Sequence, residues 1–301
     1  MKPVVHLAFS YDTESPFGKR ARTPEGRDFR KRQIELERKV LQVLNQEEVP
    51  RTYFILGTYL EGCLEDFSAS DLRELYDPEN PLNDLQQHTY SHELCRPIPG
   101  RTDKNVMSTP EFVADLKRAN ETLSSILGVQ PDGLRTPLGY CKDLSDMPHL
   151  LLALNELGFS YVSSNLRSEE LEKFLFGELN SGRQPHTYHA AGYPRIVEIP
   201  SHGLQDPIFT REKAHKLLGK APKNSQEILS YYTVLFNQAL QMAEITQRSI
   251  YIGLCLHQWA IAEYDPQLDI HRAVIDKARK KGIGFLSHAQ IKDEILASEN
   301  L

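Results

Sequence analysis

Short apolar runs recur along the chain and alternate with longer stretches in which apolar residues are spaced three or four apart. The short runs predict buried strands, and the longer spacing predicts amphipathic helices. The predicted strands are Val4–Phe9, Arg51–Leu56, Asp84–His88, Gly133–Arg135, Ser160–Ser163, Arg195–Pro200, Ile250–Leu256 and Ile283–Leu286. The predicted helices are Phe29–Gln46, Pro110–Leu127, Pro148–Leu157, Ser225–Thr246 and Asp269–Lys281. This alternation predicts an α/β protein with a parallel sheet and helices packed outside it.

The stretch Pro110–Leu127 has the clearest helical pattern. Thr109 can cap its start, Pro110 suits the first helical position, and Gly128 suits the exit. We therefore expect one regular helix between the third and fourth predicted strands.

The number of strands and the absence of a glycine-rich phosphate loop favour a barrel over a dinucleotide-binding fold. No change in composition marks a domain boundary, so we expect a single domain over residues 1–301. The segment 164–194 carries no clear strand pattern, and we expect it to be an insertion or a long loop.

Composition and charge narrow the class of protein. The net charge of −6 argues against nucleic acid as the main partner. The longest apolar stretch, SIYIGLCLHQWAIA, is too short for a membrane span and contains His257 and Gln258. The start of the chain lacks the apolar core of a signal peptide, and the four cysteines form no C-x-x-C pair. These features predict a cytoplasmic protein with reduced thiols, and they leave formation of a homo-oligomer open.

Reactive side chains follow four of the predicted strands, where the active sites of parallel α/β folds form. In chain order they are Asp12 and Glu14, His88 and His92, Arg135, and His257 with Trp259. Because the carboxyl ends of parallel strands gather at one end of the sheet, we expect these side chains to form one site.

His88 and His92 lie four residues apart in the stretch LQQHTYSHELCRP. Residues at this spacing share one face of a helical turn, and two imidazoles there can bind a single metal ion, as in H-x-x-x-H zinc enzymes. With 11 histidines in 301 residues, such a pair also arises by chance, so a third ligand and catalytic partners are required. His186 and His189 in PHTYHA imitate the pattern within the segment 164–194, and we do not expect them to bind metal.

Four ordered motifs resemble those of the polysaccharide deacetylase (NodB-homology) superfamily. HTYSH resembles its H-(S/T)-x-x-H metal motif, RTPLG resembles R-x-P-x-G, and LCLH resembles its last motif, an apolar run that ends in a catalytic histidine. VPRTYFILGTYLE resembles the strand that leads to the site. The resemblance spans roughly residues 4–260. It implies a deformed (β/α)7 barrel and metal-assisted hydrolysis of an amide, usually an N-acetyl group on a sugar.

The resemblance also implies roles for individual residues. Asp12 would be the general base, His88 and His92 metal ligands, Arg135 the residue that orients the base, and His257 the general acid. A backbone N–H near Leu138 would help bind the oxyanion, and the substrate-binding candidates are Leu138, Gly139, Tyr140 and Trp259. Trp259, the only tryptophan, suits sugar stacking and plain packing alike.

The chain departs from the superfamily pattern at two places, one that concerns the third metal ligand and one that concerns the carboxylate partner of His257. The usual first motif, T-F-D-D-G, places a ligand aspartate where this chain has Thr13. A D-x-D variant of the superfamily instead implies Glu14 as the third ligand of one divalent ion, zinc first, with cobalt, nickel or iron as alternatives. The second departure is Val162, where D-x-D relatives tend to have aspartate, so Glu198 or Asp206 becomes the candidate partner of His257.

A basic stretch, GKRARTPEGRDFRKR (residues 18–32), directly follows the first-strand carboxylates. It carries a local charge of +5 and leaves −11 for the rest of the chain. It predicts either an anion-binding segment beside the site or a solvated loop and helix start. Its basic residues are Lys19, Arg20, Arg22, Arg27, Arg30, Lys31 and Arg32.

The sequence therefore predicts a metal-dependent hydrolase that removes an N-acyl group from a sugar or sugar-phosphate substrate. One alternative is allantoinase-like hydrolysis of a small cyclic amide, which some superfamily members perform without metal. A second alternative is a binding barrel without catalysis, although Asp12, Arg135 and His257 argue against that loss.

Overall fold

The computed structural model describes residues 3–15, 23–99, 102, 104–168, 179–203, 205–210 and 222–299. Within these residues, nine strands form one sheet in the order β6-β7-β5-β4-β3-β2-β1-β8, and β9 pairs with β1. Every pairing is parallel except that of β6 with β7. The strands are β1 (Val5–Thr13), β2 (Arg51–Ile55), β3 (Asn83–Gln87), β4 (Gly133–Tyr140), β5 (Tyr161–Asn165), β6 (His186–Tyr188), β7 (Tyr193–Glu198), β8 (Ile250–Leu256) and β9 (Gly284–Phe285).

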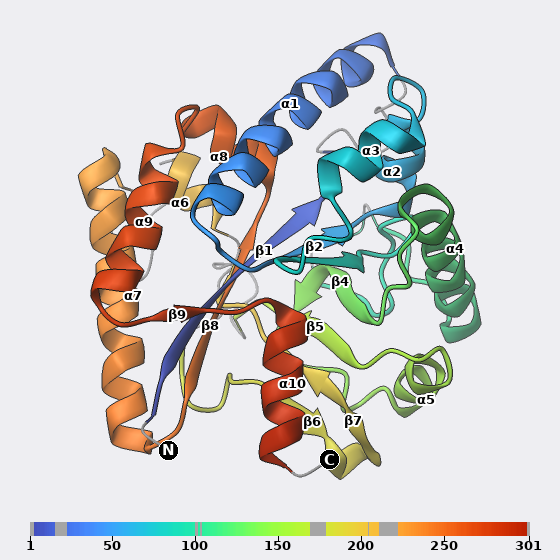
Figure 1. Cartoon of the computed structure of the whole chain (residues 1–301). Coiled ribbons are helices and arrows are strands. Elements are labelled where there is room, and N and C mark those ends of the chain that lie inside the picture. The colour runs from blue at the N-terminus through green and yellow to red at the C-terminus, as the bar shows by residue number, and fades with distance from the viewer. Residues whose placement is uncertain are drawn as a thin grey trace.

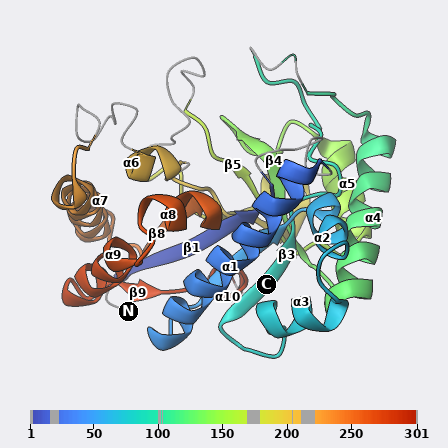
Figure 2. The same ribbon diagram turned by 90° about the horizontal axis from the view of Figure 1, so that it is seen from above.

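Helices surround this sheet, as Figures 1 and 2 show, with α2 to α5 on one side and α6 to α9 on the other. The helices are α1 (Pro24–Gln46), α2 (Gly57–Cys63), α3 (Ala69–Tyr76), α4 (Thr109–Leu127), α5 (Pro148–Glu156), α6 (Asp206–Thr210), α7 (Ser225–Thr246), α8 (Gln258–Tyr264), α9 (Asp269–Lys280) and α10 (His288–Ser298). The predicted α/β class with a parallel sheet is confirmed, and no described helix is long and apolar enough to cross a membrane.

Within the described residues the strand ladder ends at β6 on one side and at β8 on the other, and an extended segment after β7 lies along β8. The His202 N–H donates to the Gly253 carbonyl (2.8 Å), and the Gln205 N–H donates to the Cys255 carbonyl (2.8 Å). Gly253 permits this approach, because a Cβ atom there would lie 2.6 Å from the Pro200 oxygen. The result is a distorted ring of strands that is joined at this place by loop hydrogen bonds.

Two details differ from the expectations. The segment 164–194 was expected to lack a strand, but it contains β6, which pairs antiparallel with β7, and a 3-10 turn at His189–Ala191. Its residues 169–178 lie outside the described part of the chain. Helix α4 is capped by Ser108 and not by Thr109, because Ser108 and Glu111 form a reciprocal capping box.

A buried carboxyl group, Glu37, lies on α1 where it faces α2 and α3. Its oxygens accept hydrogen bonds from Tyr59 Oη (2.9 Å), Tyr76 Oη (2.6 Å) and Gln33 Nε2 (3.0 Å). The residue is 0% exposed. Burial raises the pKa of Glu37 to about 7, although the three hydrogen bonds lower it.

We expect Glu37 to make the free energy of unfolding fall as pH rises from about 4.5 to about 7. The folded state binds this proton more tightly, so its stabilising effect is complete below the ordinary pKa and disappears as pH passes the raised one. The effect is on the order of 3 kcal/mol. Between about pH 5 and about pH 8, the Tm measured by calorimetry should therefore fall less in Glu37→Gln than in the wild type. Glu35→Gln, on the exposed face of α1, is the control; identical pH dependence in all three proteins would contradict the prediction.

Candidate metal and catalytic site

The first strand places Asp12 and Glu14 on the same side, because side chains alternate along a strand. Thr13 points to the opposite side, where it is buried and its Oγ1 accepts a hydrogen bond from Gln258 Nε2 (2.9 Å). Glu14, and not Thr13, therefore lies close to the two histidines that follow β3.

The side chains of Glu14, His88 and His92 converge. The two Nε2 atoms of His88 and His92 lie 3.2 Å apart, and Glu14 Oε2 lies 3.2 Å from His92 Nε2. One ligand atom from each of the three residues lies within 4.8 Å of the others. Two imidazoles and a carboxylate are a donor set that fits a divalent cation such as zinc. The chain thus offers three protein ligands, which would leave further positions for water and substrate.

The local hydrogen bonds orient the two imidazoles differently. His88 Nδ1 lies 2.9 Å from the Arg135 carbonyl, so Nδ1 carries the proton and Nε2 presents its lone pair. Lys104 Nζ lies 3.1 Å from His92 Nδ1 and 3.1 Å from the His92 carbonyl oxygen. For His92 Nε2 to bind a cation, Nδ1 must carry the proton, and Lys104 must then donate to the carbonyl oxygen alone.

Protonation of two ligand candidates suits cation binding. Burial lowers the pKa of His92 to about 4, in spite of Glu14, so the imidazole is neutral near pH 7. Burial alone would raise the pKa of Glu14, but His92 and His257 outweigh it and hold that pKa well below its usual range. A neutral imidazole beside an ionised carboxylate is the protonation state that a divalent metal requires.

Asp12 lies beside these ligands at the end of β1 and is buried. Its Oδ1 lies 3.3 Å from Arg135 Nη1, and its Oδ2 lies 3.8 Å from His88 Nε2. The Cys255 thiol also donates to Oδ2, at 3.3 Å. Burial would raise the pKa of Asp12, but Arg135 and His88 outweigh it and lower that pKa from its ordinary value. The carboxylate is therefore ionised at neutral pH and is able to accept a proton.

His257 faces the same site from the end of β8. Its Nδ1 lies 2.7 Å from Asp206 Oδ2, and its Nε2 lies 3.3 Å from Glu14 Oε1. Burial would lower the pKa of His257, but Asp206 and then Glu14 raise it well above its ordinary value. Of the two carboxylates proposed from the sequence, Asp206 is thus the partner. Glu198 instead accepts hydrogen bonds from Ser164 Oγ and Tyr188 Oη of the neighbouring strands β5 and β6.

We expect Asp206→Asn to reduce activity most at alkaline pH. The raised pKa of His257 depends on the Asp206 carboxylate, so the variant should lose the imidazolium proton at lower pH. The measurement is kcat from about pH 6 to about pH 9. The fall of kcat on the alkaline side (the alkaline limb) should occur at lower pH in Asp206→Asn than in the wild type. A Glu198→Gln variant tests the other carboxylate. A shifted limb in that variant and none in Asp206→Asn would contradict the assignment.

A strained turn follows Arg135 on β4. Leu138 has φ 60° and Gly139 φ 59°, and the pairing of β4 with β5 is irregular between Arg135 and Tyr140. Thr89 and His92 also have positive φ, 65° and 61°. Such conformations cost about 1–3 kcal/mol each in non-glycine residues and cluster at functional sites.

The expected substrate-binding residues lie in different environments. Arg167 Nε donates to the Leu138 and Gly139 carbonyls (2.9 and 3.2 Å), which fixes the strained turn. Tyr140 is 3% exposed and its hydroxyl accepts from the Cys95 N–H (3.2 Å), so its side chain belongs to the core and not to an open substrate surface. Trp259 packs against His257 with ring centroids 5.4 Å apart.

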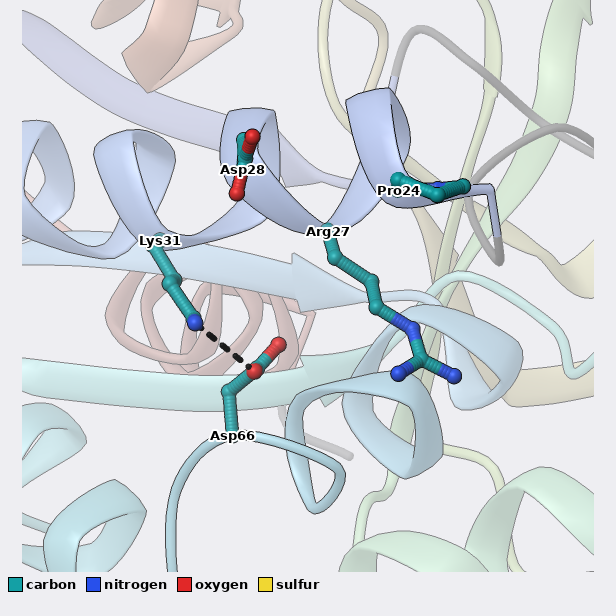
Figure 3. Close-up of a pocket in the computed structure, with 5 residues that line it drawn as sticks. All are labelled: Pro24, Arg27, Asp28, Lys31 and Asp66. Atoms are coloured by element: carbon teal, nitrogen blue, oxygen red, sulfur yellow. Dashed lines mark ion pairs between the residues drawn. The ribbon is translucent and has the colours of Figure 1, made fainter.

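In the described part of the basic stretch, three cationic side chains form ion pairs with acidic residues of the same chain. Arg30 is buried and binds Glu65 and Asp66 (2.9 and 3.0 Å). Lys31 pairs with Asp66 at 3.2 Å, and Figure 3 marks this ion pair. Arg27 binds Glu65 at 3.1 Å. These cations neutralise acidic residues that follow α2, so they do not support the anion-binding interpretation. Lys19, Arg20 and Arg22 lie outside the described residues.

Some partners in the site were not found from the sequence. Cys255 faces Asp12. Its position on β8, two residues before His257, could have predicted this, because residues two apart on a strand share a face. Lys104 and Arg167 come from loops and carried no signal. His186, which imitates a metal motif, instead pairs with Asp143 at 2.9 Å.

The fold and the site define an α/β protein with a mostly parallel sheet and with carboxylates and imidazoles gathered near its strand ends. Residues 33–162 match the family model described as polysaccharide deacetylase, and this segment contains His88, His92 and Arg135. This part of the chain is therefore similar to the polysaccharide deacetylase family, as the motifs within it predicted. The match agrees with the predicted enzyme class, a deacetylase hydrolase that acts on amide bonds.

Solved structures share the fold at low sequence identity. Proteins of Mycobacterium smegmatis and Pseudomonas aeruginosa PAO1, both provisionally assigned as polysaccharide deacetylases, are 16% and 14% identical, each with a TM-score of 0.66. An allantoinase is 13% identical with a TM-score of 0.64. Each alignment covers 99% of this chain and 92% of the other. No curated protein matches the sequence.

Proposed function

We propose that this protein is a metal-dependent hydrolase that removes an N-acyl group, acetyl first, from a sugar or sugar-phosphate substrate. The observation that carries the proposal is the convergence of Glu14, His88 and His92 beside Asp12 and His257. A divalent ion, zinc first, bound by the three ligands would supply Lewis-acid activation of water and of the amide carbonyl.

The remaining residues supply the proton transfers. Asp12, ionised and held by Arg135, takes a proton from the attacking water. His257, protonated through its bond to Asp206, gives a proton to the departing amine nitrogen. A backbone N–H at the strained turn near Leu138 donates to the developing oxyanion. The pKa of Asp12 is lowered and the pKa of His257 is raised, so Asp12 is suited to accept a proton and His257 is suited to donate one.

Hydrolysis of a small cyclic amide or ureide is a second candidate. The observation that favours it is the allantoinase whose fold resembles this chain nearly as closely as the two deacetylases do. A cytoplasmic location also remains a proposal, and it is supported by the free state of all four cysteines.

Metal analysis combined with a substrate screen tests the proposal. Purified protein should contain about one zinc-like ion per chain and release acetate from N-acetylated sugars. The screen should include their phosphates, with allantoin as the competing substrate. Protein that binds no metal after reconstitution but hydrolyses allantoin would replace the first function with the second. Metal binding without turnover of any substrate would favour a binding barrel.

A further inference from the structure

Helix α10 begins inside the ring of strands. Its first residue, His288, is fully buried, with its ring edge-to-face against Phe54 (5.3 Å between centroids) and near Tyr161 (6.3 Å). Phe54 and Tyr161 belong to one buried cluster with Ile291 of α10. The helix contacts β2, β6 and β7, and Figure 1 shows its far end near the C-terminus. The helix therefore closes the ring from the side opposite the site.

The first turn of α10 is fixed in place by polar contacts. The His288 N–H donates to Thr52 Oγ1 (2.8 Å), and the Ala289 N–H donates to Asp84 Oδ2 (3.0 Å). Asp84 Oδ2 also accepts from Thr52 Oγ1 (2.9 Å) and Tyr161 Oη (2.8 Å). Since these groups come from β2, β3 and β5, the backbone at His288 has little freedom to move.

The His288 side chain reaches the guanidinium that holds Asp12. Arg135 Nη2 donates to Ser10 Oγ (2.7 Å) and lies 3.4 Å from His288 Nε2, while Nη1 lies 3.3 Å from Asp12 Oδ1. The guanidinium carbon lies 4.4 Å from the centre of the Phe54 ring. A guanidinium only donates hydrogen bonds, so His288 Nε2 must accept and Nδ1 must carry the proton.

We propose that His288 is a positioning residue, which holds Arg135 in the orientation that places its Nη1 against the catalytic carboxylate of Asp12. The C-terminal helix is then part of the catalytic scaffold and more than a cover for the strands. Ser10 and His288 accept the two protons of Arg135 Nη2, so the guanidinium group can adopt only one orientation within its plane. The catalytic consequence rests on the proposed function, but the contact itself does not.

The protonation of His288 agrees with this geometry. Burial and the neighbouring Arg135 lower the pKa of His288 well below its ordinary value, so the ring is neutral. Tyr161 also lies near the ring, and its hydroxyl donates to Asp84.

The contact is tested in the metal-free protein by long-range nitrogen–proton NMR with nitrogen-15 histidine. We expect a neutral His288 with its proton on Nδ1, and the signal is assigned by its absence in His288→Gln. The Arg135 guanidinium should give resolved, slowly exchanging Nη protons, which are assigned by their absence in Arg135→Lys. They should persist in His288→Gln, whose amide oxygen accepts, and be lost in His288→Leu. A proton on Nε2, or Arg135 signals unchanged in His288→Leu, would overturn the proposal.

Kinetics of the metal-loaded protein test the consequence. His288→Leu should lower kcat by about 10–100-fold with KM nearly unchanged, because a small misplacement of a catalytic group is costly. His288→Gln should keep most of the rate, and metal content should be the same in all variants. His271→Leu, another buried histidine, is the control and should reduce stability without this loss of kcat. Equal losses in His288→Gln and His288→Leu would contradict positioning. If even the wild type shows no turnover, the proposed function fails, and the NMR result still decides the contact.

Discussion

Replacement of Asp12 by asparagine is expected to lower kcat by about 10²–10⁴-fold, the usual contribution of a general base. The variant keeps the shape of the side chain and its contacts with Arg135 and Cys255, but an amide cannot take a proton from water. Asp12 is not one of the three converging ligand candidates. Metal content, measured by mass spectrometry, should therefore stay at the wild-type level while turnover is lost.

The neighbouring Thr13 provides the control for this experiment. It is buried on the other side of β1, so Thr13→Val disturbs the same strand without touching the site. We expect this variant to keep its turnover. Loss of metal in Asp12→Asn would make Asp12 a ligand and require another base, and wild-type turnover in that variant would remove Asp12 from the mechanism.

Much of the site could be predicted because it depends on local rules. His88 and His257 directly follow parallel strands, Asp12 lies near the end of β1, and Arg135 lies on β4 just before its irregular part. The carboxyl ends of such strands meet in space whatever the loops do. Strand alternation then decides between Thr13 and Glu14, since only residues two apart share a face. The periodicity of apolar residues was equally sufficient for the long helices and the parallel sheet.

The parts that escaped prediction depend on contacts between distant segments. Glu198 is the last residue of β7 and Asp206 follows that strand, and only the path of the segment along β8 brings Asp206 to His257. The three residues of β6 are too few for a period to be recognised, and their partner strand defines them. His288 resembles any histidine at a helix start, and its contact with Arg135 spans 153 residues.

His88→Ala is expected to abolish metal binding and, with it, all turnover. The hydrogen bond from His88 Nδ1 to the Arg135 carbonyl orients Nε2, so His88 is the best oriented of the three ligand candidates. Removal of one of three protein ligands leaves a site that competes poorly with water for the ion. Metal content should fall from about one ion per chain to near zero, while the fold, followed by circular dichroism, remains.

His186→Ala is the matched control for the metal ligand. His186 lies in the imitation motif and pairs with Asp143, so its loss should leave metal content and turnover unchanged. Glu14→Asp adds a finer test, because Glu14 lies between His92 and His257, 3.2 and 3.3 Å away, and a shorter side chain cannot reach both. We expect weakened metal binding in Glu14→Asp and its loss in His88→Ala. Full turnover by a metal-free His88→Ala protein would instead place this chain with hydrolases that act without a metal ion.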